Sequence, residues 1–260
     1  GTPELAGQSR GTGVDMTSES AAVRTAEGAG EVVRITRCEL DLVPWRWAMA
    51  DERRDEIDAL WQRQSAANPG YFDGIVLIAR DIHIAGGVLY GELFASRFRY
   101  FLYWRDTGFA DTSVTDAFGT AILRASDGGV LLARQRGCNV NAGQVYLPGG
   151  FIDERDVGVG GRIDIVGSIA REVAEETGLD ASAMARADGL VVTRVGVHLS
   201  LAATWQSEFP ADALRERVAA HLARDPRSEL ESVLVAGSMR ELAGLPLVHY
   251  CRRLLPVLLD

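Results

Sequence analysis

Three glutamates lie within five residues of each other in the second half of the chain. Glu172, Glu175 and Glu176 are separated by the helical spacings i, i+3 and i+4, so a helix places their side chains on one face. Carboxylates crowded in this way repel each other, and a divalent cation relieves that repulsion. Mg²⁺ prefers carboxylate oxygens as ligands. The pattern therefore predicts a helix with an acidic, metal-binding face, and Gly178 is a natural residue to end it.

The same glutamates have a simpler interpretation, which is a solvated acidic helix end. Glutamate is a good helix former, and this interpretation would be preferred for any isolated glutamate-rich turn. The turn Pro148-Gly149-Gly150 lies upstream of the helix, and Gly178 follows it. The glycine pair is a weak signal alone, because it also suits an ordinary tight turn. In combination, these features favour the metal site.

Together these residues resemble the Nudix box, whose pattern is G-x5-E-x7-R-E-U-x-E-E-x-G-U, where U is a bulky aliphatic residue. The second half of the pattern is matched at every fixed position, by Arg171, Glu172, Glu175, Glu176 and Gly178, with Val173 and Leu179 at the aliphatic positions. Gly150 fits the opening glycine. The resemblance implies an α+β fold, namely the α/β/α sandwich with a mixed sheet, and a divalent metal site.

The first half of the box departs from the pattern. The arginine follows the opening glycine by 21 residues (171 minus 150) where the family has 14, so seven residues are inserted. The first glutamate of the box consequently has three candidate counterparts, Glu154, Asp156 and Asp164. That glutamate usually supports the loop, so its displacement affects loop geometry more than metal binding. The glycine-rich insertion around 157–163 is predicted to lie on the surface.

The resemblance implies roles for individual residues. Glu172 and Glu176 would be direct ligands of Mg²⁺, with Mn²⁺ as a substitute, Glu175 a ligand or a neighbouring catalytic group, and the Gly150 carbonyl a further ligand. Arg171 would orient a box carboxylate. A general base can come from outside the box, and Glu229 or Glu231, which flank the start of the last predicted strand, are the candidates. Surface charge is an equally good interpretation of these two glutamates.

A weaker resemblance covers more of the chain. The chain is similar to the Nudix subgroup that hydrolyses UDP-glucose and UDP-galactose. The similarity rests on a tryptophan-rich helix, an aromatic segment and three short motifs, Asn68-Pro69, Phe72-Asp73-Gly74 and Phe118-Gly119-Thr120-Ala121. It implies Mg²⁺-dependent cleavage of the pyrophosphate in a UDP-sugar, giving a nucleoside monophosphate and a sugar phosphate. The alternatives are the same chemistry on ADP-ribose, NADH, a coenzyme A derivative or a nucleoside triphosphate, and a non-catalytic sensor that binds a nucleotide-sugar.

Three arginines beside the aromatic segment could contact substrate phosphate: Arg97, Arg99 and Arg105. A solvated basic face is an equally good interpretation of them. The four histidines show no metal-ligand spacing, so each is predicted to be a packed or surface residue.

Composition limits the classes of partner. The 260 residues carry a net charge of −9, which disfavours nucleic acid and anionic membranes as partners. The resemblance to the Nudix family implies a small nucleotide as the partner. No apolar run approaches the roughly 18 residues of a membrane span. Cys38, Cys138 and Cys251 are far apart and odd in number, which indicates reduced thiols in a cytoplasmic protein. By resemblance, two copies can pair as a homodimer.

The hydrophobic patterning predicts three regions. Residues 1–30 form a disordered leader, part of it a cloning remnant; 31–110 form a smaller α+β module; and 111–260 form the Nudix hydrolase domain. The expected elements are strands over 31–43, 74–84, 87–94, 117–124, 130–134, 144–147, 189–205 (one or two) and 230–236, and helices over 48–67, 95–106, 164–177, 210–223 and 245–259.

Overall fold

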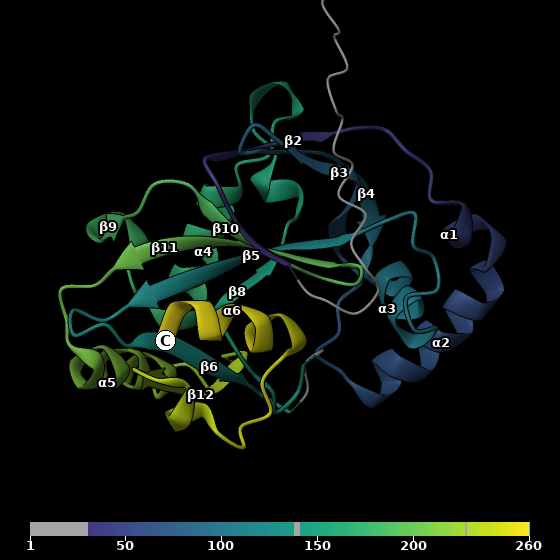
Figure 1. Cartoon of the computed structure of the whole chain (residues 1–260). Helices are drawn as coiled ribbons and strands as arrows, with labels where there is room; N and C mark the ends of the chain where they lie inside the picture. Colours follow the sequence, from purple (N-terminus) through teal and green to yellow (C-terminus); the bar gives the residue numbers. More distant parts are fainter. Residues whose placement is uncertain (1–30, 138–140, 227, 260) are drawn as a thin grey trace, which may run out of the picture.

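The structure, a computed structural model, describes residues 31–259 except 138–140 and 227 (Figure 1). The predicted leader over 1–30 and the thiol of Cys138 lie outside the described residues. Within the described residues, no helix is both long and apolar enough to cross a membrane.

A large mixed sheet forms the centre of the protein. Its strand order is β1-β10-β11-β5-β6-β12, in which β11 and β5 are parallel and the other neighbours are antiparallel. Three short strands pair at its side: β7 with β6, β8 with β5, and β9 with β11. The bounds are β1 Glu31–Ile35, β5 Asp116–Arg124, β6 Val130–Gln135, β7 Val145–Tyr146, β8 Gly149–Phe151, β9 Ala185–Arg186, β10 Leu190–Val195, β11 His198–Gln206 and β12 Leu230–Ala236.

Helices cover both faces of this sheet, because its strands are apolar on both sides. The helices α4 (Ile165–Thr177) and α5 (Ala211–Leu222) pack on one face through Ile169, Val173, Leu214 and Val218. On the other face, α6 (His249–Leu259) packs through leucines such as Leu254. Figure 1 shows α6 in yellow in front of the sheet and α4 behind it. The predicted α/β/α sandwich with a mixed sheet is confirmed.

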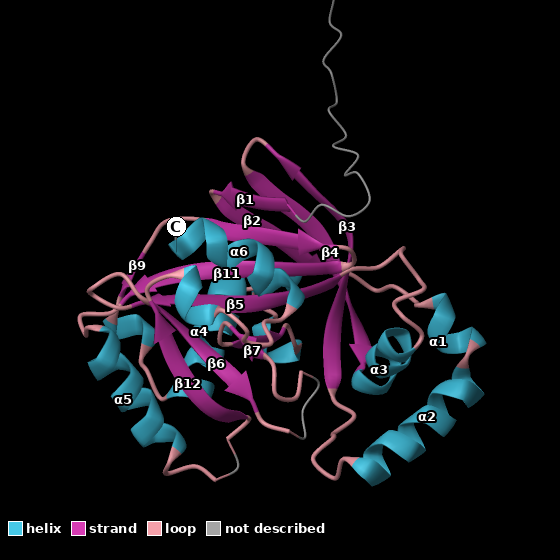
Figure 2. Cartoon of the chain, turned by 60° about the horizontal axis from the view of Figure 1, so that its bottom comes forward, coloured by secondary structure: helices cyan, strands magenta, loops and turns pink. Residues whose placement is uncertain are grey.

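A second, smaller sheet lies beside the first, with three helices on its outer side (Figure 2). Its order is β2-β4-β3, built from β2 Arg37–Leu42, β3 Ile75–Ala85 and β4 Val88–Arg97. The helices are α1 Ala48–Glu52, α2 Arg54–Ala67 and α3 Phe98–Asp106. Aromatic rings fill the space between this sheet and the helices, and they include the buried side chains of Trp47, Phe94, Phe101 and Trp104.

The first predicted strand is divided between the two sheets. β1 pairs with β10 in the large sheet, whereas β2 pairs with β4 in the small one. Thr36 lies at the division, and its backbone N–H and its hydroxyl both donate to the Gly87 carbonyl, at 2.7 and 3.0 Å. The chain from residue 31 therefore begins inside the sheet that we assigned to the second domain. The boundary at residue 110 stays a prediction.

Three predicted helices have different limits. The helix expected over 48–67 is broken at Arg53 into α1 and α2. The helix expected over 95–106 begins at Phe98, because residues 95–97 continue the pairing of β4 with β3. The helix expected over 245–259 begins at His249, because Val145 exchanges backbone hydrogen bonds with Pro246 and Val248. Short 3₁₀ turns complete the chain, η1 Glu154–Asp156, η2 Val159–Gly161, η3 Ala181–Ala183 and η4 Met239–Leu242.

Candidate metal and active site

The helix α4 carries the acidic face, and local interactions set its two ends. The Asp164 side chain accepts a hydrogen bond from the Gly167 N–H at 2.9 Å, which caps the first turn. Gly178 adopts φ = 68°, the left-handed conformation that ends a helix and that glycine adopts readily. Ile169 and Val173 face the sheet. The acids are therefore held along the side of α4 that faces β7, β8 and the loop before the helix.

Glu176 is the most enclosed of the three glutamates, with 8% of the residue exposed. Its Oε1 accepts a hydrogen bond from the Tyr146 hydroxyl, and its Oε2 accepts one from the Gly149 N–H, both at 2.9 Å. Burial raises the pKa of Glu176 to about 8, although both hydrogen bonds oppose this shift. Two hydrogen bonds thus hold the carboxyl group of Glu176 in an environment that disfavours its ionised form.

Glu172 lies directly against the glycine turn. A Cβ added to Gly150 would lie 2.7 Å from the Glu172 Oε2, so a side chain at this position would displace the Glu172 carboxylate. Arg171 Nη1 donates to Glu172 Oε1 at 2.8 Å. Burial raises the pKa of Glu172 to about 7, and Arg171 opposes this effect.

Glu175 is more open, with 52% of its side chain exposed. Its carboxylate lies 3.4 Å from Arg155 Nη1 and 3.7 Å from Arg171 Nη1. Its charge contributes to the raised pKa of Glu172. Two arginines therefore offset part of the negative charge along this face of α4.

Asp156 provides the contact expected of the displaced first glutamate. Its side chain is 2% exposed, and its Oδ1 accepts a hydrogen bond from Arg171 Nη2 at 2.7 Å. Its Oδ2 accepts from the Ser168 hydroxyl and from the Asp153 N–H, both at 2.9 Å. Of the other two candidates, Asp164 caps α4 and Glu154 is exposed. The inserted residues 157–163 follow the supporting carboxylate. Val159 among them is fully exposed, whereas Ile163 is buried and its N–H donates to the Leu40 carbonyl of β2 at 2.9 Å.

Glu229, but not Glu231, is brought toward these acids. Burial of its carboxylate and the charge of Glu175 raise the pKa of Glu229, even though the residue as a whole is exposed. The charge of Glu229 in turn raises the pKa of Glu176. Glu231 is exposed at an irregularity in the pairing of β12 with β6, and no described contact joins it to the acids of α4.

The donor set fits a hard divalent cation. Among the described residues, no group of three or more His, Cys, Asp or Glu side chains is arranged so that it could hold a metal ion without rearrangement. The partly buried carboxylate of Glu172 and the buried carboxylate of Glu176, both with raised pKa values, nevertheless lie at one glycine turn, with Glu175 beside them. A cation would remove the cost of ionising these groups. Glu172, Glu176, Glu175 and the Gly150 carbonyl are the groups that would hold it.

Two of the three arginines predicted to bind substrate are engaged elsewhere. Arg97 and Arg99 both pair with Asp73, at 2.7 and 2.6 Å, and Arg99 also pairs with Asp58 of α2 at 2.9 Å. Arg105 lies in the last turn of α3. A substrate-binding role for these arginines stays a prediction.

Sequence reasoning missed two residues that contact the acids. Tyr146 holds Glu176, and Arg155 lies between Asp153 and Glu175. Tyr146 is two residues before Pro148, so its nearness to the glycine turn was the available signal. Arg155 gave no signal, because it lies in the part of the box that departs from the pattern.

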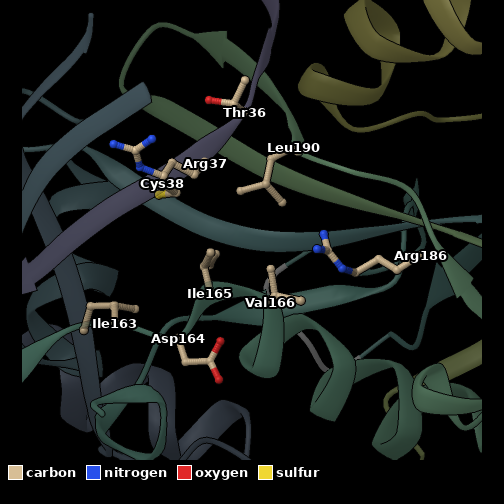
Figure 3. Close-up of a pocket in the computed structure, with 10 residues that line it drawn as sticks. Thr36, Arg37, Cys38, Ile163, Asp164, Ile165, Val166, Arg186 and Leu190 are labelled. Carbon is tan, nitrogen blue, oxygen red and sulfur yellow. The ribbon is translucent and has the colours of Figure 1, made fainter. Parts of the chain in front are cut away.

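A separate pocket of about 200 Å³ lies at the opposite end of α4 from Glu176 (Figure 3). It is enclosed by residues from the junction of β1 and β2, the start of α4, and the segment from β9 to β10. These residues include Arg37, Cys38, Asp164, Val166, Arg186 and Leu190. None of the box glutamates lines it.

The fold and the site together define an α/β/α sandwich with an acidic helix packed over a glycine turn. Residues 115–233 match the family model described as the NUDIX domain. The segment 115–233 is therefore a NUDIX domain, which confirms the resemblance of the box. The domain match supports an enzyme of the Nudix hydrolase class. The match includes the whole box and ends within β12, before α6.

Solved structures with some similarity include the MutT protein from Methanosarcina mazei Go1, at 20% identity over 55% of this chain and 92% of that one, with a TM-score of 0.36. A NUDIX hydrolase from Nitrosomonas europaea shares 17% identity over 49% of this chain and 75% of its own, with a TM-score of 0.32. The Nudix hydrolase RenU from M. smegmatis shares 18% identity over 54% and 83%, with a TM-score of 0.34. No curated protein gives a significant match to the sequence. With TM-scores this low, the neighbours carry no argument about substrate.

Replacing Gly149 by alanine is expected to damage the site through the backbone. Gly149 has φ = 152°, and an added Cβ would collide with the carbonyl oxygen of Gly119 on the paired strand β5. Strain of this kind costs about 1–3 kcal/mol. We expect a lower melting temperature and a weakened contact between residue 149 and Glu176. Gly143→Ala, at a left-handed glycine with no neighbour within 4 Å of the added Cβ, is the control for backbone strain alone. Equal effects of the two substitutions would contradict the collision.

The stability of the metal-free protein is expected to fall as the pH rises from 5 to 8. The folded-state pKa values of Glu172 and Glu176, about 7 and about 8, lie above the ordinary value of 4.5. A raised pKa contributes stability that is complete below about pH 4.5 and is lost as the pH rises through the folded value. The loss is roughly 1.4 kcal/mol per pH unit for each carboxyl that must ionise. Melting curves in chelator at several pH values measure it, and a flat profile would contradict the burial of both groups.

Proposed function

We propose that the protein hydrolyses the pyrophosphate bond of a nucleoside diphosphate derivative, with a UDP-sugar as the first candidate, in a reaction that depends on Mg²⁺ or Mn²⁺. The products would be a nucleoside monophosphate and a sugar phosphate. The observation that carries the proposal is the placement of two glutamates, the partly buried Glu172 and the buried Glu176, at the Gly149-Gly150 turn of a NUDIX domain. The small nucleotide is the proposed partner, in a cytoplasmic protein that can pair as a homodimer and binds neither nucleic acid nor membrane.

Different residues have different roles in the proposed reaction. A bound divalent cation supplies charge neutralisation at the pyrophosphate and lowers the pKa of a bound water. Glu172, Glu176 and the Gly150 carbonyl hold that cation, and Tyr146 together with the Gly149 N–H keeps Glu176 oriented. Arg171, held by Asp156, orients Glu172.

Glu175 and Glu229 are the candidates for the proton acceptor, because they are the less enclosed acids of the cluster. Glu229 is favoured over Glu231, since burial of its carboxylate, together with the nearby charge of Glu175, raises the pKa of Glu229. A general base with a pKa nearer neutrality holds and releases a proton more effectively at physiological pH.

A substrate panel tests the proposed function. UDP-glucose, UDP-galactose, ADP-ribose, NADH, coenzyme A and the nucleoside triphosphates are incubated with Mg²⁺, and the phosphate-containing products are separated and quantified. We expect turnover that is highest for the UDP-sugars and abolished by chelator. If another compound of the panel is hydrolysed fastest, the proposed reaction stands and that compound replaces the UDP-sugar as the proposed substrate. Stabilisation against heat by a nucleotide-sugar without any turnover would favour the sensor.

A further inference from the structure

The loop 68–74 between α2 and β3 presents an exposed aromatic ring. Phe72 is 81% exposed, and the other large apolar side chains that are exposed among the described residues, Ile84, Val159 and Val257, are aliphatic. In Figure 2 the loop runs from the end of α2 to the start of β3. An exposed phenylalanine is unremarkable by itself. Phe72 differs from an ordinary exposed phenylalanine because hydrogen bonds fix the residue next to it.

The residue next to Phe72 is anchored by four hydrogen bonds. Asp73 accepts from Arg97 Nε at 2.7 Å, from Arg99 Nε at 2.6 Å and from the Arg99 N–H at 3.0 Å, and its carbonyl accepts from Arg97 Nη2 at 2.9 Å. Only 9% of the Asp73 side chain is exposed. Since Arg99 also pairs with Asp58, the loop is tied to both α2 and α3. Two arginines also neutralise the only acid of the loop, so the loop does not repel an anionic ligand.

The glycine that follows sets the orientation of the Phe72 ring. The Gly74 N–H donates to the Phe72 carbonyl at 2.9 Å, and the Gly74 carbonyl accepts from the Phe98 N–H at 3.0 Å. Two carbons of the ring lie 3.2 Å from the position that a Gly74 Cβ would take. One edge of the ring therefore rests beside the backbone of Gly74, and the rest of the ring remains open. Such a held ring loses little conformational entropy when a ligand stacks on it.

A row of aromatic rings joins this loop to the metal-site turn. Tyr71, the neighbour of Phe72, meets the ring of Phe98 at 5.4 Å, and Phe98 meets Phe151 at 6.0 Å. Phe151 follows Gly150 directly in β8. The ring of Tyr71, the residue before Phe72, thus lies two ring contacts from Phe151, which adjoins the turn where the pyrophosphate is proposed to bind. A nucleoside is attached to a pyrophosphate through its ribose, so its base must lie at some distance from the metal site.

We propose that Phe72 is a substrate-binding residue that stacks on the nucleobase of the substrate. The inference rests on the proposed function, because it identifies the part of the same site that recognises the base. Aromatic stacking on a base is sequence-tolerant and does not require hydrogen-bonding groups, which suits a loop with one exposed ring. The anchoring of Asp73 by Arg97 and Arg99 then serves to position Phe72.

Binding of single products tests the inference without turnover. Titration calorimetry in Mg²⁺ compares UMP, AMP and ribose 5-phosphate with wild-type protein, Phe72→Ala and Phe72→Trp. We expect Phe72→Ala to weaken binding of UMP or AMP by about 5- to 150-fold, the range that loss of one stacked base gives. Ribose 5-phosphate should bind all three proteins equally, and Phe72→Trp should retain the affinity for the nucleotide. Val257→Ala, an exposed apolar residue on α6, is the matched control and should change nothing.

The outcomes separate this inference from the proposed function. Equal nucleotide affinity of wild-type protein and Phe72→Ala overturns the inference, even if hydrolysis is observed. Nucleotide binding that depends on Phe72 without hydrolysis of any panel member supports the inference and overturns the proposed reaction. Where a substrate is hydrolysed, Phe72→Ala should raise KM and leave kcat unchanged. A fall in kcat that matches a fall in the fraction of folded protein would instead show that Phe72 has only a structural role.

Discussion

The Glu176→Gln substitution is expected to reduce kcat by at least about 100- to 1,000-fold, the loss that removal of one preorganised electrostatic group typically causes. Glu176 is proposed to be a metal ligand, and glutamine lacks the negative charge that a divalent cation requires. The side chain keeps its length, so the oxygen of the amide can still accept a hydrogen bond from Tyr146 or from the Gly149 N–H. Steady-state rates on the substrate found in the panel measure the loss.

The fold should survive this substitution. Because burial raises the pKa of Glu176 to about 8, the ionised carboxylate is disfavoured in the metal-free protein, and a neutral amide removes that cost. The metal-free melting temperature at pH 8 should therefore equal or exceed that of the wild type, while stabilisation by Mg²⁺ should decrease. Glu216→Gln, on the exposed side of α5, is the control and should leave both quantities unchanged. Wild-type turnover in Glu176→Gln would refute the assignment of Glu176 as a ligand.

The Asp156→Ala substitution is expected to lower the free energy of unfolding by about 3–5 kcal/mol, which is typical when one partner of a buried ion pair is removed. Asp156 is nearly inaccessible, and three groups donate to it: Arg171, Ser168 and the Asp153 N–H. Without the carboxylate, the half-buried guanidinium of Arg171 loses its shortest contact and the Ser168 hydroxyl loses its acceptor. Denaturant unfolding in chelator measures the change in the free energy of unfolding.

A second aspartate provides the comparison for Asp156. Asp164→Ala removes the cap of α4, and loss of a helix cap costs typically about 1 kcal/mol. The two substitutions therefore distinguish the carboxylate that supports the box from the one that caps its helix. If Asp164→Ala cost more than Asp156→Ala, the assignment of Asp156 to the place of the missing glutamate would be wrong. At a temperature where both variants are folded, only Asp156→Ala should also lower kcat, because Arg171 then no longer orients Glu172.

The acidic helix and the fold class were predictable from local pattern. The i, i+3, i+4 spacing and the helix-ending Gly178 are set by interactions within a few residues, and these are visible in the sequence. The strand expected over 31–43 was different, because nothing local marks Thr36 as the point where the chain passes from one sheet to the other. Pairing partners far along the chain, β10 and β4, decide that division.

The sequence by itself determined which residues could carry a cation, since carboxylate crowding and the glycine turn are properties of residue type and spacing. The tertiary structure alone decided which of the neighbouring charges join them. It selected Asp156 over Glu154 and Asp164, brought Glu229 rather than Glu231 to the acids, and engaged Arg97 and Arg99 with Asp73. The physical reason is that burial and ion pairing depend on distance in space, and loops of variable length bring together groups whose separation along the chain carries no regular period.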